Sequence, residues 1–376
     1  MKFKKIVSPL QAYHSFLLMV LVYSVNGSIF CPSGCRCNDA ATDCDRALLG
    51  SVPIMLSPHL VSLSLASNNI ETIQQDLIFF TNLENLDISS NKLRKIGEDA
   101  FEGQQILRKL NLMNNSLISL EENDFQGLFN LEYLNLNNNQ LKFINALAFK
   151  GLTSLENLHI AGNQIENVNH YGLEYLYNIK YIDFSNNKMN EIPVEPIENL
   201  TTLEVINLSN NYISYINSQS FHGHNMLSIL DLSRNNIRSI QPDAFAGLES
   251  LKKLKISDNK IRTIPDNLFI PLKSLSHLDI SANHFRSISK DFLEKLPLLT
   301  HLKIERCPAL NSIDKLAFRN LEQLQILSLR ENPSLTSFFP EAFVPLPDLA
   351  ILDLSYCGLT MISAQQVRIC PFSFYS

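Results

Sequence analysis

Residues 131–141, "LEYLNLNNNQL", belong to a pattern that fills most of this chain. "LENLHIAGNQI" (155–165), "LEVINLSNNYI" (203–213) and "LKKLKISDNKI" (251–261) follow the same template, L-x-x-L-x-L-x-x-N-x-L, in which apolar residues exchange. The step is 24 residues almost throughout, with 23 at the start and 25 at the last two steps. The first position of the template falls at Leu60, Leu83, Leu107, Leu131, Leu155, Ile179, Leu203, Leu227, Leu251, Leu275, Leu299, Leu324 and Leu349.

A fixed period of 20–29 residues with this template is typical of a leucine-rich repeat solenoid. The L-x-L alternation predicts a short strand with one buried and one exposed face. We therefore expect an α/β-type repeat fold. It would be a right-handed, horseshoe-like solenoid of about thirteen coils over residues 58–376, with one parallel sheet on its concave side.

One slot of the template holds an amide, which both donates and accepts hydrogen bonds. The chain leaves the strand there, and a buried amide can bind the backbone groups that lose their strand partners. We expect these asparagines to stack as a ladder. Cys307 and Cys357 fill the same slot, which predicts buried thiols with weak hydrogen bonds. The asparagines are Asn68, Asn91, Asn115, Asn139, Asn163, Asn187, Asn211, Asn235, Asn259, Asn283 and Asn332.

A second column of large apolar residues recurs six residues before the next copy begins. A stacked stripe at constant period is expected to fill the core on the convex side of the coils. Its members are Phe101, Phe125, Phe149, Phe221, Phe245, Phe269, Phe318 and Phe343, with Leu173, Ile197 and Leu293 in three copies.

The first 27 residues have the layout of a cleaved secretory signal: basic "MKFKK", apolar "SFLLMVLVYSV" and a small-residue exit at residues 25–27. An uncleaved signal anchor is the alternative, although the apolar run falls short of the roughly 20 residues that a membrane span needs. No later stretch reaches that length. The mature chain is therefore expected to be secreted.

Four of the seven cysteines form the cluster C-x3-C-x-C-x6-C, at Cys31, Cys35, Cys37 and Cys44. A thiolate metal site is expected mainly in a reducing compartment, so disulfides are the better interpretation for an exported chain. Spacing alone leaves the three possible pairings open. Residues 28–57 are predicted to form an N-terminal cap.

Together these motifs resemble the extracellular, typical 24-residue leucine-rich repeat proteins of animals, over nearly all of residues 30–370. The resemblance implies an N-terminal cysteine cap with Cys31–Cys37 and Cys35–Cys44 disulfides. The last copies, "LKIERCPALNSIDKLAFRNLEQLQILSLRENPSLTSFFPEAF", are similar to those of neuronal-type leucine-rich repeat receptors. Such receptors continue into a C-terminal cysteine cap, an immunoglobulin domain and a membrane span.

The final stretch, "VRICPFSFYS" (367–376), continues the thirteenth coil, and a fourteenth would begin at Ser373. No C-terminal cysteine cap follows. An open apolar end implies a partner, a missing segment or instability. The expectation is a truncated form of a longer, membrane-anchored receptor, with an end-to-end homodimer of a short secreted form as the alternative.

Ligand-binding candidates are the outward-facing residues of the predicted sheet. Aromatic side chains on a polar face are typical hot-spot material for protein partners. A basic patch in later copies suggests a glycosaminoglycan, although acidic residues interleave with it. The first set is Tyr133, Asn135, Asn157, His159, Tyr181 and Asp183; the basic patch is Lys253, Lys255, His277, His301 and Lys303.

Three sequons follow the predicted signal, at Asn114, Asn199 and Asn207. Asn199 is expected off the sheet, where glycosylation is easiest. Asn207 is expected mid-strand on the concave face, where a glycan would block its repeat.

The formal net charge of −6 and the pI near 5.9 argue against a general nucleic-acid binder. No hydrolase, metalloprotease, phosphate-loop or dinucleotide-binding motif is present. "HGH" at residues 222–224 is expected in a convex loop rather than a metal site.

We therefore predict no enzyme activity, cofactor or metal, but an extracellular scaffold for protein recognition in adhesion or signalling. The alternatives are a glycosaminoglycan-binding matrix protein and the non-catalytic front of a longer enzyme or receptor.

Overall fold

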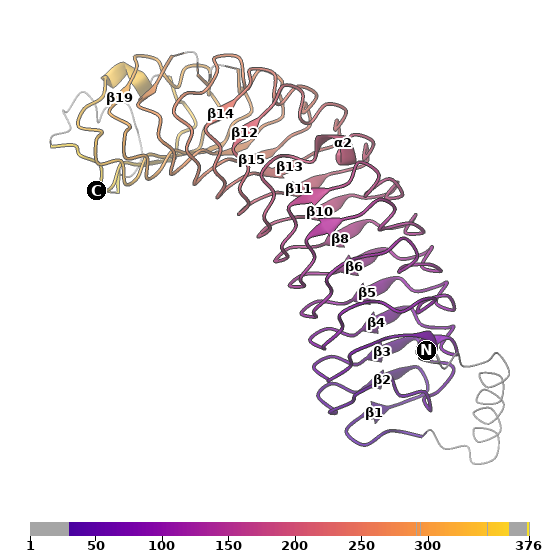
Figure 1. The fold of residues 1–376 in the computed structure, drawn as a ribbon. Helices are drawn as coiled ribbons and strands as arrows, with labels where there is room; N and C mark the ends of the chain where they lie inside the picture. The colour runs from indigo at the N-terminus through magenta and orange to yellow at the C-terminus, as the bar shows by residue number, and fades with distance from the viewer. Residues whose placement is uncertain (1–29, 291, 294, 344, 361–373, 376) are drawn as a thin grey trace. The chain divides into compact units, whose positions relative to one another are not determined.

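The computed structural model describes residues 30–290, 292–293, 295–343, 345–360 and 374–375 (Figure 1). The predicted signal and residues 361–373 of the tail lie outside this part. The chain divides into two compact units, Met1–Leu155 and Glu156–Ser376. In the described part, no helix is long and apolar enough to cross a membrane.

The first unit is a stack of short strands joined by loops. β1 runs antiparallel to β2, with Arg36 opposite Asp43, and each later strand of this sheet lies parallel to the one before it. Its elements are β1 (Arg36–Cys37), β2 (Ala41–Asp43), β3 (Ser62–Ser64), η1 (Gln75–Leu77), β4 (Asn85–Asp87), β5 (Lys109–Asn111), β6 (Tyr133–Asn135) and β7 (Phe143–Ile144).

The second unit continues the pattern with one parallel strand per repeat. The sheet strands are β8 (Asn157–His159), β10 (Tyr181–Asp183), β11 (Val205–Asn207), β13 (Ile229–Asp231), β15 (Lys253–Lys255), β16 (His277–Asp279), β18 (His301–Lys303), β20 (Ile326–Ser328), β21 (Ile351–Asp353) and β22 (Phe374–Tyr375). β22 pairs in parallel with β21. The chain therefore starts a further strand close to the predicted fourteenth position.

Shorter elements form the remaining sides of these coils. β12 pairs in parallel with β14, and β17 pairs in parallel with β19. We call this the lateral ladder of the second unit. The elements are β9 (Asn167–Val168), α2 (Val194–Ile197), β12 (Tyr215–Ile216), β14 (Ser239–Ile240), β17 (Ser287–Ile288), β19 (Ser312–Ile313) and η2 (Pro340–Phe343).

The asparagine ladder is present in both units. The Asn235 amide donates to the carbonyls of Leu208 and Leu232 at 2.9 and 3.1 Å, and its oxygen accepts the N–H of Ile213 at 3.0 Å. Leu208 and Ile213 belong to the preceding coil. One side chain thus binds two coils together, in a site that is almost fully buried.

The two cysteines in this slot keep part of that pattern. Cys307 is buried, and burial raises the pKa of its thiol to about 11. Its Sγ contacts the Glu305 carbonyl at 3.4 Å. Cys357 is only half-buried, unlike the expectation, but its Sγ still contacts the Leu329 carbonyl of the preceding coil at 3.1 Å.

The phenylalanine column fills the core as expected. Its members are nearly or fully buried, as are Leu173, Ile197 and Leu293. Neighbouring rings stack, with centroids 6.1 Å apart for Phe125 and Phe149.

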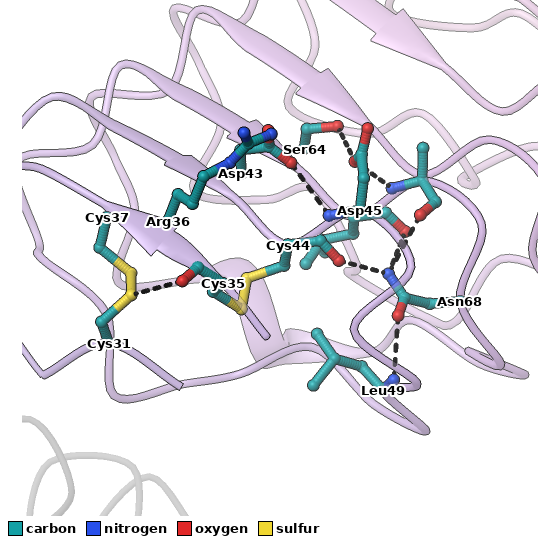
Figure 2. Close-up of a disulfide and its surroundings, with 12 residues drawn as sticks. Cys31, Cys35, Arg36, Cys37, Asp43, Cys44, Asp45, Leu49, Ser64 and Asn68 are labelled. Atoms are coloured by element: carbon teal, nitrogen blue, oxygen red, sulfur yellow. Dashed lines mark hydrogen bonds and ion pairs between the residues drawn. A yellow bond between two sulfur atoms is a disulfide. The ribbon is translucent and has the colours of Figure 1, made fainter. Parts of the chain in front are cut away.

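The N-terminal cap contains the two disulfides that the resemblance implied, Cys31–Cys37 and Cys35–Cys44 (Figure 2). Cys44 is fully buried, and its carbonyl accepts a hydrogen bond from the Asn68 amide at 2.8 Å. The first asparagine of the ladder is therefore anchored on the cap. In the described residues, no cluster of side chains could hold a metal ion.

We predict that Asn259→Ala lowers the free energy of unfolding by about 3 kcal/mol, because it leaves buried backbone groups of two coils without partners. Asn259→Cys should cost less, since a thiol functions in this slot at Cys307. The exposed Asn267→Ala serves as the control. Urea denaturation followed by circular dichroism measures all three, and equal midpoints for the Ala and Cys variants at position 259 would contradict the ladder.

We also predict that replacing both members of Cys35–Cys44 by serine destabilises the first unit more than replacing both members of Cys31–Cys37. A disulfide contributes typically 2–4 kcal/mol. Cys35–Cys44 also fixes the fully buried Cys44, whose backbone carbonyl must stay in place to accept the hydrogen bond of Asn68. Limited proteolysis of the two variants compares them. A chelator should leave the wild-type pattern unchanged, whereas a reductant should accelerate cleavage; the reverse would identify a metal site.

Candidate functional site

Each three-residue strand buries its middle residue and turns the first and third outward. Because the strands pair in register, equivalent residues of successive repeats form two rows on the outer face of the sheet. In the second unit the first row is Asn157, Tyr181, Val205, Ile229, Lys253, His277, His301, Ile326 and Ile351. The second row is His159, Asp183, Asn207, Asp231, Lys255, Asp279, Lys303, Ser328 and Asp353.

In the first unit, the predicted ligand residues Tyr133 and Asn135 lie on β6. Burial raises the pKa of Tyr133, and this effect outweighs a hydrogen bond with Asn135, which lowers it. Asn135 is buried, and its oxygen accepts the N–H of Asn137 at 3.0 Å. This asparagine therefore supports the turn and presents little surface to a ligand.

In the second unit, the other four predicted residues lie on neighbouring strands. Asn157 and His159 are on β8, and Tyr181 and Asp183 are on β10. The rings of His159 and Tyr181 are 4.8 Å apart. Burial lowers the pKa of His159, with the charge of Asp183 acting in the opposite direction. A histidine with a lowered pKa is uncharged at neutral pH, so the pair presents an aromatic surface there.

Most aspartates and asparagines of the second row have a structural bond. The side-chain oxygens of Asp183, Asn207 and Asp231 each accept the N–H two residues later, at 2.9–3.0 Å. Such a bond closes a local turn at the end of the strand. Sequence reasoning assigned Asp183 to ligand binding alone and missed this role. An aspartate or asparagine two residues before a serine, as in "DFS", "NLS" and "DLS", is the sequence pattern that indicates this turn-closing bond.

Three outward residues that sequence reasoning did not combine form an apolar stripe: Tyr181, Val205 and Ile229. The strand registers place them side by side on β10, β11 and β13, and all three are half-buried. The fold does not require apolar residues at these outward positions. The sequence already indicated part of this stripe, because the third template position is valine at 205 and isoleucine at 229 rather than a polar residue.

The predicted basic patch is mixed in charge. Lys255 pairs with Asp231 at 3.1 Å, and Asp279 lies between Lys255 and Lys303 in the second row. The rings of His277 and His301 stack with centroids 4.2 Å apart. Burial, followed by the charges of His301 and Lys253, lowers the pKa of His277, so this ring is uncharged at neutral pH.

The three sequon asparagines occupy different environments. Asn199 is exposed just after α2. Asn114 is exposed in a turn with a φ of 55°. Asn207 is half-buried and is the last residue of β11, rather than a mid-strand residue as the sequence suggested.

The "HGH" motif does not assemble a metal site. His222 is exposed, whereas His224 is buried in a slot that leucine holds in most copies. The His224 ring nitrogens lie 3.2 and 3.0 Å from the carbonyl oxygens of Phe221 and Ile197. This histidine is a core residue.

Comparisons with known proteins agree with this architecture. A leucine rich repeat family model matches residues 58–117, 105–165, 177–237, 225–285 and 297–359. Leucine-rich repeat-containing protein 3B of Homo sapiens is 34% identical over 93 residues, which are 24% of this chain and 35% of that protein. Oligodendrocyte-myelin glycoprotein of Homo sapiens is 31% identical over 85 residues, 22% of this chain and 19% of that protein. The similarity thus spans about a third or less of these relatives.

Among solved structures, the Toll–Spatzle complex from Drosophila contains a chain with a similar fold. The TM-score is 0.74 at 24% identity, over 83% of this chain and 42% of that one. The matched family model covers most of the residues between 58 and 359. The chain therefore belongs to the leucine-rich repeat family.

Proposed function

We propose that this chain is an extracellular or cell-surface recognition protein, in adhesion or signalling, that binds a protein ligand on the outer face of its sheet. The observation that carries the proposal is the apolar stripe of Tyr181, Val205 and Ile229 on a face that the fold keeps rigid. Interface cores are enriched in aromatic and apolar residues surrounded by polar groups. The aromatic pair of His159 with Tyr181 extends the stripe at one end.

Rigidity of this face follows from the bonds beneath and beside it. The asparagine ladder fixes each strand end, and the second-row side chains close the following turns. A preorganised surface pays less conformational entropy when it binds. The solved complex of Toll with Spatzle is consistent with a protein ligand for a member of this fold.

The alternatives have weaker support. A glycosaminoglycan on the basic patch would meet Asp279 and the Lys255–Asp231 pair, which reduce the local positive charge. The non-catalytic front of a longer receptor or enzyme remains compatible with the matched relatives, since the matches span only part of their length. We retain the protein-recognition proposal because Val205 and Ile229 place apolar side chains, only half-buried, next to Tyr181 on the outward face of the sheet.

We predict that Tyr181→Ala weakens partner binding at least tenfold, because truncation of a central aromatic side chain typically costs about 2 kcal/mol or more. The matched control is Tyr212→Ala, which removes an exposed tyrosine of the same unit outside the sheet rows. Partners are first identified by screening cell-surface ectodomains with the purified chain, and affinities are then measured by surface plasmon resonance. A larger loss for Tyr212→Ala than for Tyr181→Ala would reject this surface.

We also predict that glycans occupy Asn199 but not Asn207 in the form that binds a partner. Asn207 shares β11 with Val205, so a glycan there would cover the stripe. Peptide mapping by mass spectrometry of chain produced in animal cells gives the occupancy of each sequon. Full occupancy of Asn207 in partner-bound material would move the binding site elsewhere.

A further inference from the structure

Three arginines occupy one position of consecutive repeats in the second unit. "NNIRSI" (235–240), "NKIRTI" (259–264) and "NHFRSI" (283–288) place Arg238, Arg262 and Arg286 at successive steps of 24 residues, and all three are exposed. Arg238 and Arg286 directly precede β14 and β17, and Arg262 holds the same repeat position on the coil between them. The three residues, which we call the arginine column, therefore stack like charges on neighbouring coils.

This stacking differs from the ion pairs that link other coils of the unit. At two other positions of the unit, a charge on one coil meets the opposite charge on the next: Lys180 contacts Glu156 at 2.8 Å and Lys255 contacts Asp231 at 3.1 Å. Over the residues with described positions, no member of the column has an ion-pair partner. Like charges on neighbouring coils repel one another, although salt screens this repulsion at exposed side chains. An anionic ligand that binds along the column would remove this repulsion.

A hollow lies beside the column because the lateral ladder is interrupted at Pro265. The equivalent residues Gln241 and Asp314 donate their N–H groups to Ile216 and Ile288 of the preceding coils, at 3.0 Å in both cases. Proline has no N–H and cannot form this bond. Residues 262–265 accordingly form no strand, although β14 and β17 lie on the coils to either side.

The hollow has a volume of about 600 Å³. Two guanidinium groups, one imidazole and three hydroxyl groups line it, and within the described region no carboxylate does. Asp266, two residues after Ile264, is not part of the described lining, and Asp291, next to Phe292 along the chain, lies outside the described residues. The polar lining residues are Arg262, Thr263, His284, Arg286, Ser287 and Ser289.

A second hollow shows that the backbone interruption does not itself require positive charge. Pro193 interrupts the coil between β9 and β12 in the same way, and a hollow of about 290 Å³ lies there. Its charged lining residues are Glu166, Glu191 and Glu195. The positive lining beside the arginine column is thus a property of its side chains.

We propose that the arginine column and its hollow bind a linear sulfated polysaccharide. Guanidinium groups bind tetrahedral oxyanions through paired N–H donors. A column of charges at regular spacing suits a chain of anionic groups better than a single anion, and the hydroxyl groups suit sugar and sulfate oxygens. A single-stranded nucleic acid would need several exposed rings for base stacking. Phe285 is buried and Phe292 packs edge-on against Phe269, so His284 is the exposed ring of the described lining.

The test measures binding of heparin to the purified chain by surface plasmon resonance at about 0.15 M salt, where screening removes weak long-range attraction. Arg262→Gln/Arg286→Gln should raise Kd roughly tenfold or more, since it removes two charge-assisted contacts. The matched control, Lys253→Gln/Lys303→Gln, changes the net charge equally but lies on the sheet face. It should change Kd less than twofold.

Three further probes identify the ligand class: hyaluronan, which has carboxylates but no sulfates, polyglutamate and a single-stranded RNA. Each should bind at least tenfold more weakly than heparin. Equal binding of any of them through the same arginines would overturn the assignment to a sulfated polysaccharide. Equal weakening by the two double variants, or no heparin binding by wild type, would reject the site itself. Circular dichroism should show the same fold for all variants, because every substituted side chain is exposed.

The proposal is independent of the sheet-face function. Tyr181→Ala should leave heparin binding unchanged, and Arg262→Gln/Arg286→Gln should leave protein-ligand binding unchanged unless that ligand also requires the polysaccharide.

Discussion

The buried side-chain amide that follows the sheet strand in most repeats makes the interaction on which this fold depends. A coil of 24 residues must turn its backbone inward after three strand residues, and the groups that leave the sheet cannot reach water. Asn211 illustrates the solution: its amide donates to Phe184 of the preceding coil and to Leu208 of its own, while its oxygen accepts the N–H of Met189. Removing such an amide leaves several buried polar groups without hydrogen-bond partners at once.

This constraint has a consequence for function. Since the ladder fixes the register of the coils, residues at each of the remaining repeat positions line up in a column. The residue type in a column is set either by the fold or by a binding partner. Phenylalanine fills the core column, and aspartate or asparagine closes turns in the second row. The apolar stripe and the arginine column neither fill the core nor close a turn. Both are therefore the best candidates for recognition.

The fold could be predicted from the sequence because its rules act at fixed spacing. The thirteen template copies, the asparagine slot and the phenylalanine column all followed from period and residue type, and the cap disulfides followed from family resemblance. The candidate site was less predictable. Asp183 and Asn135 appeared to be available for a ligand, but both have turn-closing bonds that depend on side-chain orientation. The two hollows depend on single missing N–H groups at Pro193 and Pro265, whose effect on neighbouring coils the pattern alone does not specify.

Amide hydrogen exchange at residue resolution tests the central claim most directly. The N–H groups of Ile213, Ile237 and Ile261 lie outside every strand, but each donates to a ladder asparagine at 3.0–3.1 Å. If the asparagine ladder holds the coils together, these amides exchange as slowly as those of the sheet strands β11, β13 and β15. Exchange as fast as that of the exposed turn at Asp266 and Asn267 would contradict the account.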